Sequence, residues 1–292
     1  METTGINTSY EPFSDRPEYL ELNRGFIVDL AIEGARTFLD LACGTGNLSA
    51  EIFKRTPRAE VVGVDICRES LYIARKRAGG RREDDGTIEQ ASSTRSLFLV
   101  EGSADRIPLD EKSVDVVVMG NSIHNLPDLD LLLDEIYRVL RPSGVFAFNT
   151  SFYAGTFAPG TERFYLQWMK EALRFVQATD TALKNRGEGG VQRKRGSRPR
   201  STDNPWLSAD QYHEALERHH FRVLPTNERV VPMSRESFES VGSYAGLASV
   251  LLSGYPVELA CQALEETAAT ALAAVGMDSV PRLWLEIAAE KN

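Results

Sequence analysis

Two short segments early in the chain carry residues suited to holding a nucleoside. Residues 39–47 read Leu-Asp-Leu-Ala-Cys-Gly-Thr-Gly-Asn, an apolar run that stops at Gly44 and Gly46. Apolar residues then recur at helical spacing, which predicts a strand that turns into a helix. Glycines at such a turn let a ligand approach the main chain closely. A second apolar strand, residues 61–65, ends in Asp65, whose carboxylate can accept hydrogen bonds from the two vicinal hydroxyls of a ribose.

The residue at the position of the third glycine in a Gly-x-Gly-x-x-Gly motif distinguishes two classes of nucleotide site. A dinucleotide fingerprint has a third glycine there, which packs the helix on the strand beneath a pyrophosphate. Here that position is Ser49. The turn instead resembles motif I of the class I S-adenosylmethionine-dependent methyltransferases, with Asp40, Gly44 and Gly46 at matching positions and Ala42 where many members have a glycine. The resemblance implies that S-adenosylmethionine is the cofactor and S-adenosylhomocysteine the product.

The resemblance continues in the expected order over the first half of the chain. Residues 97–100 predict a third strand, and Asp105 just after it resembles the carboxylate that holds the adenine amino group in this family. Residues 114–119 form a continuous apolar run, which is typical of a central parallel strand buried on both faces. The resemblance also implies further cofactor contacts, at Ile66, Ala104 and Asn121.

The order of the remaining elements predicts the fold class. Apolar residues from Leu129 to Leu140 have helical spacing, residues 145–148 and 221–224 predict further strands, and residues 281–290 resemble the closing antiparallel strand of this family. We therefore expect an α/β fold with a doubly wound, Rossmann-like, seven-stranded sheet, an antiparallel last strand and helical cap insertions.

This fold suggests how the chain is divided. We expect an N-terminal helical lid (residues 1–34), an S-adenosylmethionine-binding core (35–151), an aromatic and basic cap insertion (152–205) and a C-terminal part of the core (206–292). The last part carries inserted helices over residues 235–275, predicted as one helix over 236–252 and another over 256–275.

Composition limits the classes of partner. The chain has 292 residues, 42% of them apolar, and a net charge of -9, which argues against a nucleic-acid partner. We find neither an apolar stretch long enough to span a bilayer nor a signal-peptide pattern, so we expect a cytoplasmic monomer or homodimer with no membrane partner. The acidic surface and the large cap favour a small-molecule acceptor, as in secondary metabolism.

Proton removal from the acceptor is the task for which candidate residues are few. His124 lies in the loop after the fourth strand, at the rim of the acceptor pocket that the resemblance implies, and imidazole titrates in the range of a general base. Glu162 and Glu171 are alternative bases, and Tyr153 is an alternative hydrogen-bond donor. No cluster of His, Asp and Glu indicates a metal.

Aromatic side chains are expected to line the acceptor pocket, although plain packing is the alternative for each. They are Tyr10, Phe13, Tyr19, Phe152, Tyr165, Trp168 and Trp206. Closure of such a lid would exclude water and align the acceptor with the methyl group.

One combination of residues suggests a narrower acceptor. Seven basic residues lie between Lys184 and Arg200, against the single acid Glu188. Basic side chains could hold a diphosphate, aromatic faces could stabilise a carbocation and a cap glutamate could take a proton. These are the needs of C-methylation at the alkene of a prenyl diphosphate such as geranyl diphosphate. The alternatives are that the loop is a connector, and that the reaction is O-methylation with His124 as base.

Two rival functions remain open. An NAD-dependent oxidoreductase is the rival enzyme, which Ser49 and Asp105 argue against. A scaffold that binds S-adenosylmethionine without catalysis is the rival of another class, and the intact set of motifs argues against it.

Overall fold

The chain forms two compact units in the computed structural model, which describes residues 11–78, 96–194 and 206–292. The sheet unit comprises Tyr19–Thr156, Trp206–Arg229 and Leu283–Asn292. The helical unit comprises the described parts of Met1–Glu18, Phe157–Pro205 and Val230–Arg282. Tyr10 and the basic residues after position 194 fall outside the described residues.

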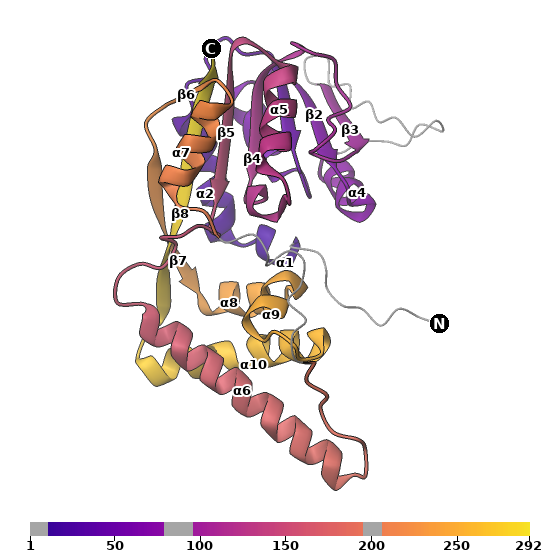
Figure 1. The fold of residues 1–292 in the computed structure, drawn as a ribbon, viewed down its shortest axis with the longest axis vertical. Helices are drawn as coiled ribbons and strands as arrows, with labels where there is room; N and C mark the ends of the chain where they lie inside the picture. The colour runs from indigo at the N-terminus through magenta and orange to yellow at the C-terminus, as the bar shows by residue number, and fades with distance from the viewer. Residues whose placement is uncertain (1–10, 79–95, 195–205) are drawn as a thin grey trace. The chain divides into compact units, whose positions relative to one another are not determined.

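A single mixed sheet organises the strands (Figure 1). They are β1 (Thr37–Leu41), β2 (Glu60–Asp65), β3 (Ser96–Glu101), β4 (Val114–Gly120), β5 (Leu140–Thr150), β6 (Phe221–Val223), β7 (Asn227–Ser234) and β8 (Ser279–Lys291). The order is β3-β2-β1-β4-β5-β8-β6, and β7 pairs with β8 off this path. Neighbouring strands from β1 to β5 are parallel, whereas β8 is antiparallel to β5 and β6. The predicted Rossmann-like sheet with an antiparallel last strand is confirmed.

The helices divide between the two units. The sheet unit has α2 (Pro17–Asp29) from Tyr19 onward, α3 (Asn47–Arg55), α4 (Arg68–Arg77), the short helix η1 (Ile123–Asn125), α5 (Leu129–Val139) and α7 (Ala209–Arg218). The helical unit has α1 (Glu11–Ser14), α6 (Glu162–Asn185), α8 (Arg235–Gly242), α9 (Ala245–Leu251) and α10 (Val257–Val275). No described helix is both long and apolar enough to cross a bilayer.

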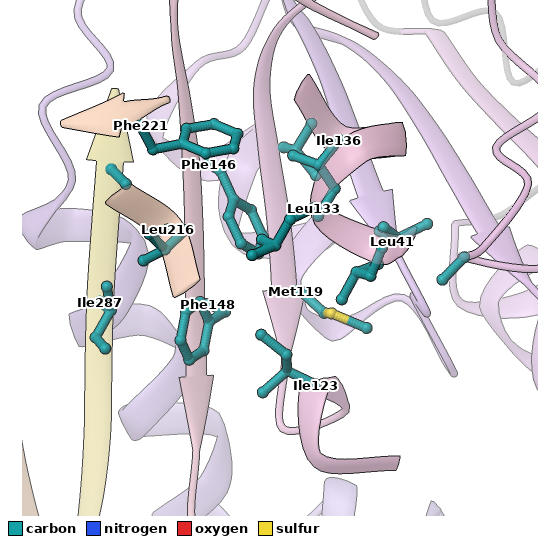
Figure 2. Close-up of a cluster of buried hydrophobic side chains, with 14 of the residues drawn as sticks. Leu41, Met119, Ile123, Leu133, Ile136, Phe146, Phe148, Leu216, Phe221 and Ile287 are labelled. Atoms are coloured by element: carbon teal, nitrogen blue, oxygen red, sulfur yellow. The ribbon is translucent and has the colours of Figure 1, made fainter. Parts of the chain in front are cut away.

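Helices cover both faces of the sheet. On one face, α5 and α7 pack on the central strands through side chains such as Leu133, Phe146 and Leu216 (Figure 2). On the other face, α2 and α3 contribute Phe26 and Ile52 to a second buried cluster. Because both faces are covered, the edge formed by the carboxyl ends of the parallel strands is where this kind of fold places its ligands.

The helical unit has an aromatic interior of its own. The rings of Phe164 and Trp168 on α6 lie 4.5 and 5.3 Å from the ring of Phe238 on α8. The indole N–H of Trp168 donates to the carbonyl of Leu264 on α10 at 2.8 Å. Several aromatics of the predicted cap insertion therefore hold α6, α8 and α10 together.

Two details differ from the sequence-based expectation. β7 was predicted neither as a strand nor as part of the sheet, and it makes the described sheet eight-stranded. The helix predicted over residues 236–252 is two helices, α8 and α9. The first of them, α8, ends at Gly242. A Cβ atom there would lie 3.0 Å from the main chain of Leu264 and of Glu265, so the α10 backbone packs directly against this glycine.

Candidate functional site

The loops that follow β1, β2, β3 and β4 meet at one edge of the sheet, because these strands are parallel neighbours. The loop after β1 is the glycine turn, with positive φ at Ala42 (54°), Gly44 (52°) and Gly46 (80°). A Cβ atom on Gly44 would meet nothing within 4 Å, so the turn is open on that side. Its shape and openness suit close approach of a ligand to the main chain.

Asp65, at the end of β2, joins the glycine turn to the start of α4. One carboxylate oxygen accepts a hydrogen bond from the Gly44 N–H at 2.8 Å, and the other accepts one from the Cys67 N–H at 2.8 Å. Cys67 is the N-cap of α4, so Asp65 also orders the start of that helix. Each carboxylate oxygen can accept a further bond, which leaves capacity for ribose hydroxyls.

Asp40 and Ser49 form a buried pair beneath the turn. One oxygen of Asp40, which is 1% exposed, accepts from the Ser49 N–H at 2.9 Å and from the Ser49 hydroxyl at 2.6 Å. Burial raises the pKa of Asp40 to about 7; the Ser49 bonds lower it, and the charge of Asp65 raises it further. Ser49 thus ties the first turn of α3 to β1, a role that sequence analysis missed.

The loop after β3 lies beside Asp65. The Gly102 N–H donates to the Asp65 carbonyl at 3.0 Å, which brings the segment holding Ala104 and Asp105 to the same edge. Ala104 is buried and the Asp105 side chain is half-buried; within the described chain, the carboxylate of Asp105 has no hydrogen-bond donor. Ile66 is 72% exposed at the end of β2.

Asn121 begins a network of buried amides that reaches α2. Its φ is +47°, and its side-chain oxygen accepts from the N–H and the hydroxyl of Ser151 at 2.9 and 3.2 Å. The Asn149 side chain accepts from the Asn121 N–H at 3.0 Å and donates to the Asn23 oxygen at 3.1 Å. Sequence analysis missed Asn23, Asn149 and Ser151, although a polar run at the end of an apolar strand was a usable signal.

Tyr19 lies on α2 near these amides. Burial raises the pKa of its phenol to about 12; the Asn23 amide lowers it, and the charge of Asp40 raises it. Its ring packs against Trp284 of β8, with ring centroids 6.4 Å apart. Tyr19 is thus a protonated, buried phenol close to the donor side of the site.

His124, on η1 after β4, lies in an aromatic group on the same unit. Its ring stacks on Phe152, with centroids 4.1 Å apart, and Trp206 packs edge-on against Phe152 at 5.6 Å. The Nδ1 atom of His124 lies 3.2 Å from the Thr150 hydroxyl. The structure therefore brings together three of the predicted acceptor-site residues. Tyr153 follows directly, and its hydroxyl donates to Glu228 at 2.7 Å.

The other predicted acceptor-site residues lie in the helical unit. Phe13 and Trp168 are buried there, and Tyr165 packs edge-on against Phe157 at 4.6 Å. Glu162 is exposed, and Glu171 accepts from Gln167 at 2.6 Å and from Arg174 at 2.7 Å.

The described part of the basic loop is tied to its own unit. Lys184 pairs with Asp180 at 2.7 Å and Arg186 with Glu188 at 3.2 Å. Arg193 lies over the ring of Tyr255 at 5.0 Å. Across the described ranges, no group of three His, Cys, Asp or Glu side chains is arranged to hold a metal ion.

Comparison with known proteins finds a family match in the first part of the sheet unit. The sequence profile described as "Methyltransferase domain" matches residues 39–148, which include the glycine turn, Asp65, Asp105 and His124. Over these residues the chain is similar to methyltransferase domains. This similarity agrees with the resemblance of the motifs to the class I methyltransferases, for which S-adenosylmethionine is the methyl donor.

Curated relatives match about two fifths of the chain. A demethylmenaquinone methyltransferase of Lactobacillus johnsonii is 33% identical over 120 residues, 41% of this chain and 45% of that protein. A demethylmenaquinone methyltransferase of Thermus thermophilus is 38% identical over 118 residues, 40% of this chain and 48% of that protein. The chain thus spans less than half the length of these curated relatives.

A solved structure shares the fold over most of the chain. It is the YcgJ protein of Bacillus subtilis, with a TM-score of 0.55 at 14% identity, covering 93% of this chain and 99% of that one. This similarity shows the fold and leaves the acceptor of the methyltransferase domain unspecified.

Proposed function

We propose that the chain is an enzyme that transfers a methyl group from S-adenosylmethionine to a small-molecule acceptor. The observation that carries the proposal is Asp65, held at the end of β2 by the Gly44 and Cys67 N–H groups beside an open glycine turn. A carboxylate so placed suits the two hydroxyls of a ribose.

The residues present suit this cofactor. Asp65 would accept hydrogen bonds from the ribose, and Asp105 would accept one from the adenine amino group. The open main chain at Gly44 and Gly46, with Asp40 beneath it, would lie under the amino-acid part, and Ile66, Ala104 and Asn121 would add contacts. No pyrophosphate is present in this ligand, so the absence of a third glycine at Ser49 is no obstacle.

Methyl transfer then requires mainly that the acceptor atom be aligned with the S–CH3 bond. S-adenosylmethionine supplies a methyl group activated on a sulfonium, which an acceptor atom in line can attack while the electron pair of the S–C bond stays on sulfur. The stacked rings of His124 and Phe152, with Trp206 against them, form an aromatic group in which His124 and Trp206 are half-buried and Phe152 is buried. Such a group suits an aromatic acceptor.

The names of the relatives support a reduced quinone as that acceptor, and a secondary metabolite with a similar ring would meet the same requirements. A prenyl diphosphate is the alternative. It is less favoured because Lys184 and Arg186, two of the described basic residues, are paired with carboxylates.

Methyl transfer from deuterated S-adenosylmethionine tests the proposal. The full chain is incubated with a panel that includes reduced demethylmenaquinone, simpler hydroquinones and geranyl diphosphate, and products are analysed by mass spectrometry. We expect one trideuteromethyl group on an aromatic acceptor. Tight binding of S-adenosylmethionine with no labelled product from any acceptor would favour a non-catalytic scaffold.

A further inference from the structure

A buried asparagine at the end of β5 links helix α2 to the turn after β4. Asn149 is 0% exposed, and Asn23 on α2 is 1% exposed. The Asn149 side-chain oxygen accepts a hydrogen bond from the Asn121 N–H at 3.0 Å. The Asn149 amide nitrogen donates to the side-chain oxygen of Asn23 at 3.1 Å. One buried side chain therefore bonds to two segments that are far apart in the sequence.

The orientation of the Asn149 amide group follows from the chemistry of its partners. A main-chain N–H group can only donate a hydrogen bond, so the Asn149 atom that faces the Asn121 N–H must be the oxygen. The Asn149 nitrogen then faces Asn23 and needs an acceptor there, because a buried N–H group without one is costly. The side-chain oxygen of Asn23 is that acceptor. Asn23 therefore stabilises the orientation of Asn149 that the turn requires.

The turn at Asn121 depends on these bonds because its backbone is unfavourable on its own. Asn121 has a φ of +47°, in the left-handed region that residues other than glycine adopt uncommonly. Its N–H also bonds to the Asn149 carbonyl at 2.9 Å, and its side-chain oxygen accepts from the Ser151 N–H at 2.9 Å. These partners all lie at the end of β5, so a change in Asn149 acts directly on the turn.

Helix α2 lies against the same end of the sheet. A Cβ atom on Gly120, the last residue of β4, would lie 3.0 Å from the side chain of Leu48 and 3.7 Å from the hydroxyl of Tyr19. Tyr19 and Asn23 both belong to α2, so two independent contacts place this helix against the carboxyl ends of β4 and β5. The glycine turn and Asp65 follow neighbouring parallel strands and lie at the same edge.

We infer that Asn149 and Asn23 are positioning residues for the donor site: Asn23 on α2 fixes the amide of Asn149, which holds the left-handed turn at Asn121 in the shape that the donor site uses. The role toward the donor rests on the proposed function, whereas the link between α2 and the turn does not. The link acts in both directions, because a ligand that binds this shape of the turn better also favours the docked position of α2.

Amide hydrogen exchange tests the link without any ligand. Asn23→Leu removes the acceptor and inserts a residue of similar size that favours helix. We expect the Asn121 amide proton to exchange about 3- to 10-fold faster, the range for loss of one hydrogen bond, although the change is on α2. Asn23→Asp keeps an acceptor and should exchange as slowly as the wild type. Equal exchange in Asn23→Leu and the wild type would overturn the inference and leave the methyltransferase proposal standing.

A neighbouring residue separates the link from general loosening of α2. Leu22 precedes Asn23 on the helix and is 2% exposed, so Leu22→Ala weakens the packing of α2 but keeps the Asn23 oxygen. We expect Leu22→Ala to lower the melting temperature at least as much as Asn23→Leu does, with the slow exchange of the Asn121 amide retained. Exchange that instead follows the melting temperature across all variants would contradict a specific role for the amide pair.

Binding of S-adenosylhomocysteine to the folded variants tests the role toward the donor. By calorimetry, we expect Asn23→Leu to bind about 3- to 10-fold more weakly than the wild type and Asn23→Asp to stay within about twofold of it. Asn149→Leu removes the bond to Asn121 itself and should lose more affinity than Asn23→Leu. Wild-type affinity in both leucine variants would overturn the positioning role. Absence of binding by the wild type would instead contradict the proposed function.

Discussion

At the carboxyl end of β2, Asp65 connects the glycine turn, the start of α4 and the ligand-facing edge of the sheet through two hydrogen bonds of 2.8 Å. Asp65 thus orders the start of α4, and each of its carboxylate oxygens can accept a further hydrogen bond. Ordering of the start of α4 and the proposed contact with a ribose are therefore compatible.

Replacement of Asp65 should weaken binding of the cofactor. Asp65→Ala removes charge-assisted hydrogen bonds to the ribose, so we expect the free energy of S-adenosylhomocysteine binding to fall by about 1.5–3 kcal/mol in calorimetry. Glu101→Ala is the matched control, because it removes an exposed carboxylate at the end of the neighbouring strand. An unchanged affinity in Asp65→Ala would restrict this residue to ordering the loop.

Asp40 should make the folded protein less stable as pH rises, the reverse of the usual effect of a carboxyl group. Its pKa in the folded protein is about 7, above the ordinary value near 4, so the folded state holds the proton more tightly than the unfolded state. Its contribution to stability is complete below about pH 4 and is lost as pH rises to about 7. We expect Asp40→Asn, measured by urea unfolding, to be more stable than the wild type at pH 8, by an amount that shrinks toward pH 4.

Asp115 provides the opposite case as a control. Although burial raises the pKa of its carboxyl, hydrogen bonds from Thr37, Arg36 and Arg141 lower it to about 2. Its contribution is therefore complete above about pH 4 and is lost only as pH falls toward 2. Between pH 4.5 and 8, the free energy of unfolding of Asp115→Asn should be lower than that of the wild type by a constant amount. A deficit that varies over this range, or a pH-independent difference for Asp40→Asn, would contradict these assignments.

On the scale of elements, α4 supports the glycine turn from one side. A Cβ atom on Gly46 would lie 3.2 Å from the Cβ of Ala74, and Arg77 donates to the side chains of Thr45 and Asn47 at 3.0 and 2.9 Å. Asp65 therefore orders the start of α4 and bonds to the glycine turn, and α4 in turn supports the same glycine turn through Ala74 and Arg77.

Loss of this brace should affect binding more than stability. We expect Arg77→Ala to weaken S-adenosylhomocysteine binding by about 3- to 10-fold, as for the loss of ordinary hydrogen bonds, with a melting temperature close to that of the wild type. Lys76→Ala is the control, because its ammonium group lies over the ring of Tyr72 instead. If the two variants bind equally well, the brace has no role in the donor site.

A second link between elements involves β7. Arg229 donates to the buried Glu286 of β8 at 2.7 Å and to Asp29 of α2 at 2.6 Å. We expect Arg229→Met to lower the free energy of unfolding by about 3–5 kcal/mol, because it leaves a buried carboxylate without its cationic partner, with only the Asn227 amide still donating to it. Adding Glu286→Leu should recover much of the loss. Arg222→Met, at an exposed pair with Glu290, should cost at most about 1 kcal/mol, and a similar cost for Arg229→Met would contradict this account.

Sequence patterns predicted the helices and strands whose apolar residues have a regular period. They failed to predict features that depend on contacts between distant parts of the chain. The strands from β1 to β4 are largely apolar runs followed by turn residues, and the apolar residues of α5 keep helical spacing throughout. β5 begins at Leu140, ahead of the apolar run predicted at residues 145–148. β7 contains Glu228, Arg229 and Pro232, which together weaken a strand pattern; the proline is tolerated because β7 pairs with β8 alone. The polar run at the end of β5 marks Asn149 and Ser151, but their pairing with Asn23 and Asn121 could not be predicted, because these partners are far away in the sequence.

On the scale of the whole molecule, the two units differ in how much the sequence reveals. The sheet unit contains residues 39–148, which match the methyltransferase profile. The motifs there depend on the geometry of turns and strand ends, which short stretches of sequence encode. The helical unit is built from three separated segments, and its relation to the acceptor depends on contacts that no local pattern encodes. The donor is therefore well defined, and the acceptor remains a proposal.

Calorimetric titration of the wild-type chain with S-adenosylhomocysteine, S-adenosylmethionine and NAD tests the central claim most directly, because it needs no acceptor. We expect S-adenosylhomocysteine and S-adenosylmethionine to bind at one site per chain and NAD to give no measurable heat. Preferential binding of NAD, or no binding of any of the three by the folded protein, would contradict the account.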